Sequence, residues 1–221
     1  MFAAGYDSSS WWPWVVAMAL LGCVLSPATE ALIARRLPRL GRLPSLPVRI
    51  TTAALTGLVC AAFAARIGIS LGLPAYIFLA VLGVQLARID IALHLLPNPL
   101  VLALLAGGLL LLLAPGILNQ QADNLLRAVL GAAILFAGYL LLGLISPGGI
   151  GMGDVKLAAP VGLYLGYLGW SHLLHGGLLG FVLNGLITVV VLRRKSSETV
   201  TEVAHGPSML GATAFAALFF A

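Results

Sequence analysis

The sequence predicts an all-α, polytopic integral membrane protein with about eight transmembrane helices, and its composition leads to this fold class. Of its 221 residues, 61% are hydrophobic and 9% are charged, whereas a soluble domain carries roughly 45–50% apolar and about 25% charged residues. Because so few charged residues do not cover the surface of a compact domain in water, the outside of the protein is expected to face lipid. The net charge of +5 does not indicate a nucleic-acid partner, because the basic residues lie at the edges of apolar runs.

Each predicted helix is an apolar run bounded by turn residues or charges, and a span needs about 20 such residues. These runs leave no room for a second, soluble domain, so residues 1–221 are expected to form a single membrane-embedded domain. The last run is short and fits either a full span or an interfacial helix. In chain order the runs cover residues 12–34, 50–66, 72–89, 97–116, 125–145, 155–170, 173–192 and 208–221.

The segments between the runs carry the signals that end and begin the helices. An Arg- and Pro-rich stretch, 35–49, follows the first run, and the polar stretch 119–124 follows the fourth. A glycine-rich stretch, 147–153, precedes the sixth run, and a proline, Pro207, stands where the eighth begins, a favoured place for proline in a helix.

The basic residues predict the orientation in the membrane. If the N-terminus is outside, ten of the twelve lysines and arginines fall on the cytoplasmic side, which is the bias of inner-membrane proteins. Both termini are then expected outside, with Trp11, Trp12 and Trp14 at the outer interface. The inner residues are Arg35, Arg36, Arg39, Arg42, Arg49, Arg88, Lys156, Arg193, Arg194 and Lys195, against Arg66 and Arg127 outside.

Metal or cofactor chemistry has little support in the sequence. Cys23 and Cys60 lie inside apolar runs and form neither a CxxC motif nor a disulfide framework. His172 and His175 are three residues apart with no carboxylate nearby, so interface packing is favoured over a metal site. We therefore expect no metal and no cofactor.

Two of the four aspartates, Asp90 and Asp154, are the candidate catalytic residues. Asp90 follows the third apolar run and Asp154 precedes the sixth, so both are expected at the cytoplasmic face. Two carboxylates in a low-dielectric site share a proton, which leaves one as base and the other as acid. Such a pair activates water to hydrolyse a peptide bond without a metal or a nucleophilic side chain.

Glycines before Asp154 have two interpretations. Gly151 and Gly153 let an extended substrate strand approach closely, or they allow a turn with positive φ. Alternatively, they form an ordinary flexible turn in which Asp154 is the N-cap of the next helix. Lys156 stands two positions further on, where it supports the site or anchors the inner face.

These residues resemble the type IV prepilin peptidases, which are bacterial membrane aspartic proteases. Residues 151–157 read GMGDVKL, similar to the family's GxGDxKL motif, and Asp90 is followed by Leu96-Pro97-Asn98, similar to its other aspartate region. The resemblance covers residues 73 to about 192. It implies cleavage of a short basic leader, usually ending in Gly, from type IV prepilin or pseudopilin precursors at the cytoplasmic face of the cell membrane.

The chain also departs from the longer members of that family. It lacks their two CxxC pairs, which resemble a zinc site, so the resemblance is to the short form and does not imply N-methylation of the new amine. Apolar residues also replace several polar positions that the family usually shows after the aspartate that Asp90 resembles. His94 is the remaining polar residue there. The replacing residues are Ile91, Ala92, Leu93 and Leu95.

Two alternative functions are less well supported. Presenilin and signal-peptide-peptidase-like GxGD proteases carry a Tyr-Asp pair and a later Pro-Ala-Leu, but here Ile89 precedes Asp90 and Ser208 follows Pro207. A small transporter or assembly protein would use two acids near mid-bilayer and show internal repeats, whereas these acids are expected at an interface. Neither the pilin system nor the oligomeric state follows from the sequence.

Overall fold

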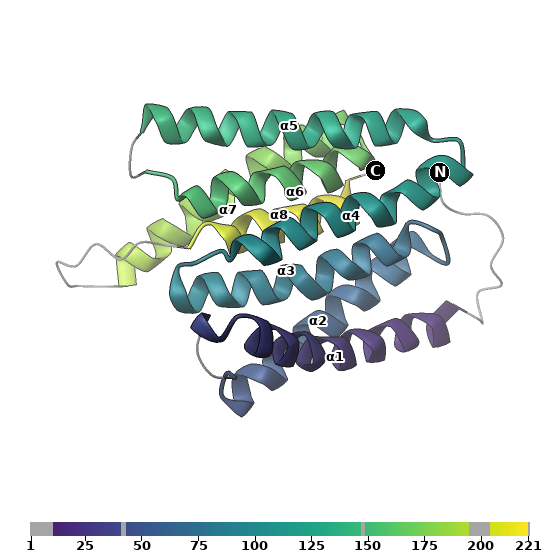
Figure 1. The fold of residues 1–221 in the computed structure, drawn as a ribbon, viewed down its shortest axis with the longest axis horizontal. Coiled ribbons are helices and arrows are strands. Elements are labelled where there is room, and N and C mark those ends of the chain that lie inside the picture. The colour runs from purple at the N-terminus through teal and green to yellow at the C-terminus, as the bar shows by residue number, and fades with distance from the viewer. Residues whose placement is uncertain (1–10, 41–42, 147–148, 195–203, 221) are drawn as a thin grey trace. The chain divides into compact units, whose positions relative to one another are not determined.

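The computed structural model describes residues 11–40, 43–146, 149–194 and 204–220, and these residues form helices joined by short connections (Figure 1). A 3₁₀ turn, Pro38–Leu40, follows the first helix. The α-helices are α1 (Trp11–Arg36), α2 (Leu46–Ile67), α3 (Leu73–Leu93), α4 (Asn98–Leu118), α5 (Ala122–Ile145), α6 (Met152–Leu168), α7 (Trp170–Arg194) and α8 (Gly206–Phe219).

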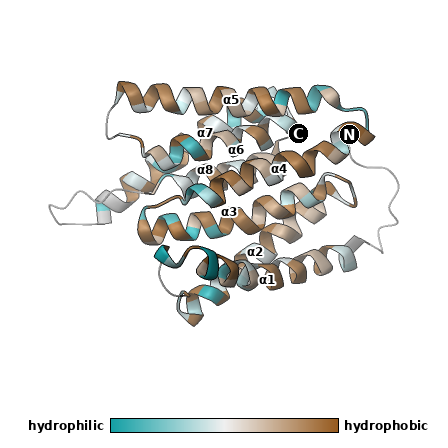
Figure 2. Cartoon of the chain, viewed as in Figure 1, coloured by the Kyte–Doolittle hydropathy of each residue, from teal (hydrophilic) through white to brown (hydrophobic). Residues whose placement is uncertain are grey.

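The all-helical membrane class is confirmed. Within the described ranges, six helices are long and apolar enough to cross a membrane, namely α1 to α5 and α7. Large apolar side chains are also exposed, for example Leu110 (67%) and Ile145 (78%). Figure 2 shows that hydrophobic residues predominate along most of the helices. Such surfaces require lipid, so the chain is an integral membrane protein. Because α6 has 17 residues and α8 has 14, spans by these two stay a prediction.

Several helix ends differ from the expected boundaries. Helix α2 begins at Leu46, so Arg49 lies in its first turn and not in the preceding connector. Helix α3 continues beyond Asp90 to Leu93, so the aspartate lies within its last turn. Some residues used in the sequence argument lie outside the described ranges, namely the tail 1–10, Arg42, Gly148 and Lys195.

The chain divides into two compact units, residues 1–85 and 86–221, with the boundary inside α3. In the first unit, α1 packs along α2 through small residues. A Cβ atom on Gly57 of α2 would lie 2.8 Å from the carbonyl oxygen of Ala19 and 2.5 Å from Cys23 Sγ. The absence of a side chain therefore permits this close approach, as is common between membrane helices. The single domain expected over residues 1–221 stays a prediction.

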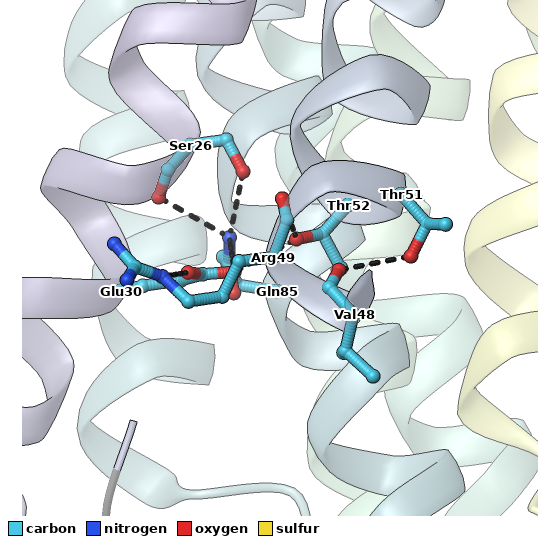
Figure 3. Close-up of polar contacts among 7 residues, drawn as sticks. All are labelled: Ser26, Glu30, Val48, Arg49, Thr51, Thr52 and Gln85. Carbon is cyan, nitrogen blue, oxygen red and sulfur yellow. Dashed lines mark hydrogen bonds and ion pairs between the residues drawn. The ribbon is translucent and has the colours of Figure 1, made fainter. Parts of the chain in front are cut away.

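A buried carboxylate, Glu30 of α1, is the centre of a polar cluster in the first unit (Figure 3). Its Oε1 accepts hydrogen bonds from Thr52 Oγ1 at 2.8 Å and from Gln85 Nε2 at 3.5 Å. Arg49 Nε donates to Oε2 at 3.2 Å, and Gln85 also donates to Ser26 Oγ at 3.1 Å. The cluster thus joins α1, α2 and α3, and it compensates the burial of a charge in an apolar helix.

We expect Glu30→Ala to destabilise the protein. The change leaves Arg49 without this carboxylate and costs about 3 kcal/mol, the lower end of the range for a broken buried pair because Arg49 is partly exposed. Thermal unfolding in detergent should then show a Tm lower by about 6–12 °C. Glu30→Gln should lower the Tm less. Thr51→Ala should lower it little, because Thr51 lies next to Thr52 but is exposed. A drop below about 2 °C in Glu30→Ala would contradict the assigned role.

The second unit is built around α6, which packs against α4, α5, α7 and α8. Nearly all of its residues from Val155 to Tyr167 are buried. Its closest neighbour is α5, where a Cβ atom on Gly131 would lie 2.5 Å from the carbonyl oxygen of Gly162. Glycine at both positions therefore lets the two backbones touch. This central position holds the first turn of α6, which carries Asp154, among the ends of its neighbours.

Candidate active site

The carboxylate of Asp90 lies in the last turn of α3 and is buried, with 5% of the residue exposed. Its Oδ2 accepts a hydrogen bond from the backbone N–H of Gly206, at 3.1 Å. His94, the residue that follows α3, adds an electrostatic interaction. An acidic side chain at the end of an apolar helix is thus held by the first residue of α8.

Asp154 lies in the first turn of α6 and is half-buried. Gly151 occupies the N-cap position with a φ of −67°, so the alternative that made Asp154 the N-cap is wrong. The suggestion of positive φ at Gly151 or Gly153 is also wrong, since among the described glycines only Gly68 and Gly169 adopt it. Space is the remaining reason for glycine here, because a Cβ atom on Gly151 would lie 3.2 Å from Asp154 Oδ2.

The two aspartates, far apart in the sequence, are brought close together by the fold. Buried Leu96 lies against the backbone beside both carboxylates: its Cβ would be 3.1 Å from a Cβ on Gly153, and its Cδ1 would be 3.3 Å from one on Gly206. Burial, and secondly the neighbouring charge of Asp90, raise the pKa of the Asp154 carboxyl to about 6, against a hydrogen bond from the Gly151 backbone. The Asp154 carboxyl therefore holds its proton to a higher pH than an isolated aspartate does.

Lys156 does not turn to the carboxylates in this structure. Its Nζ donates a hydrogen bond to Asn98 Oδ1 at 3.0 Å on the exposed surface. Because Asn98 begins α4 directly after Leu96-Pro97, this bond joins the two sequence motifs that carry the aspartates. Lys156 is thus placed as a surface link between the starts of α6 and α4.

Three further residues surround the pair and were not among the predicted site residues. Tyr139 of α5 is buried and interacts electrostatically with Asp154. Its hydroxyl lies 3.0 Å from Nε2 of His205, the N-cap residue of α8, and Gly206 follows. In the sequence, Pro207 indicated only that a helix begins there. No local pattern showed that this start meets Asp90, because the contact joins segments more than 100 residues apart.

No group of three or more His, Cys, Asp or Glu side chains in the described ranges is arranged to hold a metal ion. The histidine pair near the start of α7 packs against the C-terminal segment. His172 Nε2 lies 3.0 Å from the carbonyl oxygen of Phe220, and the His175 ring lies 5.3 Å from the Phe220 ring.

Comparison with known proteins decides the family. The model of the type IV leader peptidase family matches residues 75–192, which include both Asp90 and Asp154. The chain belongs to the type IV leader peptidase family. This confirms the expected resemblance. The matched region ends before His205 and Gly206, so it does not include the residue that donates the hydrogen bond to Asp90.

Three curated relatives support membership in the leader peptidase family, and each is called prepilin leader peptidase/N-methyltransferase. The protein of Stutzerimonas stutzeri is 35% identical over 55% of this chain and 41% of its own length. That of Bacillus subtilis (strain 168) is 36% identical over 51% and 43%, and that of Aeromonas hydrophila 30% identical over 69% and 52%. The chain thus spans about half the length of these relatives or less. No solved structure gives a significant match.

Proposed function

We propose that the chain is a membrane aspartic endopeptidase that removes the basic leader peptide from type IV prepilin or pseudopilin precursors. The observation that carries this proposal is the meeting of Asp90 and Asp154 from the end of α3 and the start of α6. Family membership supports the substrate class, since the curated relatives are named for prepilin leader cleavage. The proposal is confined to cleavage and does not extend to N-methylation.

In the proposed reaction, Asp90 is the base and Asp154 the acid. The ionised carboxylate of Asp90 takes a proton from the attacking water, while protonated Asp154 donates a hydrogen bond to the scissile carbonyl oxygen and then its proton to the leaving amine. The raised pKa of Asp154 suits the acid role. The N–H that Gly206 donates to Asp90 suits the base role, because such a bond stabilises a charged carboxylate.

Co-expression with a candidate prepilin tests this function. The unaltered chain should produce the faster-migrating mature pilin, and mass spectrometry should place the new N-terminus directly after the basic leader. A prepilin with the leader Gly replaced by a bulky residue serves as the control, which should stay uncleaved. Unprocessed precursor with every candidate prepilin, in membranes that contain the chain, would refute the proposal.

We further propose that the active site faces the cytoplasm and that both termini lie outside. The support is the ten-to-two division of basic residues. A reporter fused after Arg39 or Lys195 should register as cytoplasmic, and one fused after Asp123 as external. Alkaline phosphatase and green fluorescent protein fusions measure the two sides independently. An external reading at Arg39 would reverse the orientation and place the aspartates on the other face.

A further inference from the structure

A hydrogen bond from one backbone N–H group joins the start of α8 to Asp90. The first N–H groups of a helix have no partner inside the helix and carry partial positive charge. His205 gives α8 no side-chain cap, and Gly206 instead donates its N–H to Asp90 Oδ2 at 3.1 Å. One carboxylate oxygen is thereby fixed in direction, so rotation of the Asp90 carboxyl is restricted.

Gly206 has no space for a side chain at this contact. A Cβ atom there would lie 2.7 Å from Asp90 Oδ2 and 3.3 Å from Leu96 Cδ1. The φ of Gly206 is not positive, so an alanine suits the backbone itself. Any side chain at position 206 therefore acts on Asp90 by displacing its carboxylate.

Two rings, Tyr139 of α5 and Phe181 of α7, pack against the ring of His205, the residue before Gly206. We call these three rings together the aromatic clasp. Tyr139 and Phe181 stack with ring centroids 4.9 Å apart, and Phe181 lies 5.4 Å from the His205 ring. The Tyr139 hydroxyl adds its contact with His205 Nε2. The clasp thus sets where the N–H of the next residue points.

We infer that Gly206 is a positioning residue of the aspartic dyad, and that the aromatic clasp holds its N–H against Asp90. This inference rests on the proposed function. It assigns to the start of α8 the task of orienting the base, while Asp154 is oriented by its own helix. Among the described residues, the titratable groups that interact with the dyad are His94, beside Asp90, and Tyr139, beside Asp154; His205 contacts Tyr139.

The first test compares the same substitution at two glycines of α8. In a cleavage assay in detergent, Gly206→Ala should lower kcat by about 100-fold with KM within about twofold, as expected for a misplaced catalytic group. The acidic limb of the kcat profile should move to higher pH, because the charged base loses its donor. Gly211→Ala, where nothing lies within 4 Å of the added atom, should match the unaltered chain. Unchanged kcat in Gly206→Ala would overturn the inference.

A second variant keeps the test decisive if Gly206→Ala does not reach the membrane. His205→Phe keeps a ring in the clasp and removes Nε2, and it should lower kcat about tenfold at normal membrane abundance, the size of effect that a lost orienting hydrogen bond produces. Full activity in His205→Phe would exclude the clasp from positioning.

A third measurement does not depend on cleavage. Gly206→Ala should lower Tm by about 4 °C in the unaltered chain and by less than half as much in an Asp90→Ala background, where the conflict with the carboxylate is gone. Equal losses in both backgrounds would overturn the inference. Coupled losses in a chain that cleaves no prepilin would leave the Gly206 contact standing and refute only the proposed function.

Discussion

Replacing either aspartate of the pair with asparagine is expected to stop leader cleavage. Asparagine is nearly the same size as aspartate but does not transfer the proton, so Asp90→Asn and Asp154→Asn should each lower the cleavage rate by about 10²- to 10⁴-fold. The double variant should be little slower than either single one, because the two carboxylates act as a unit. The rate of mature pilin formation in detergent-solubilised membranes measures the loss.

Asp123→Asn is the matched control for this experiment. Asp123 lies exposed in the first turn of α5, so the same chemical change there should leave cleavage and membrane abundance unaltered. Immunoblots of the membrane fraction separate loss of activity from loss of protein. Cleavage retained by either dyad variant would remove that residue from the mechanism, and equal losses in all three would point to general destabilisation.

A valine at position 153 is expected to have the second large effect. A Cβ atom there would already lie 3.1 Å from the Cβ of Leu96, a buried residue whose side chain also lies close to Gly206. The two further methyl groups of valine should push Leu96 and the first turn of α6 apart. We therefore expect Gly153→Val to lower cleavage by about 100-fold through misplacement of Asp154, and Gly153→Ala to lower it less.

Gly185→Val provides the comparison, because Gly185 is exposed on α7 with nothing within 4 Å of an added Cβ. The Gly185→Val variant has the same free-energy cost of a β-branched residue in a helix. Its side chain does not conflict with the residues around the two aspartates. Membrane abundance of both variants should equal that of the unaltered chain. Full cleavage by Gly153→Val would show that the glycine motif is only a connector.

The sequence alone predicted the membrane class, the approximate helices and the two aspartates, because each of these depends on local composition. Long apolar runs form helices in lipid whatever their neighbours are, since every backbone group must be satisfied within the segment. A carboxylate beside such a run is costly and therefore stands out. The glycine motif before Asp154 and the Leu-Pro-Asn segment after Asp90 then predicted the family, which the family match confirmed.

Other properties depended on contacts between distant segments. Glu30 lies inside an apolar run, and only the approach of α2 and α3 supplies the Arg49, Thr52 and Gln85 side chains that make its burial tolerable. Likewise, His205 and Gly206 carry no local signal beyond a helix start. Their contacts with Tyr139 and Asp90 arise because α5 and α3 pack near the start of α8.

The sequence by itself determined which residues are apolar enough to lie in lipid and which two acids are placed at helix ends. Only the tertiary structure decided that these acids meet, that Lys156 turns to Asn98, and that Gly206 holds Asp90. The physical reason is that hydrophobic periodicity, and the free-energy cost of a charged residue beside the bilayer, are properties of a single segment. The direction of a hydrogen bond depends instead on how several helices pack.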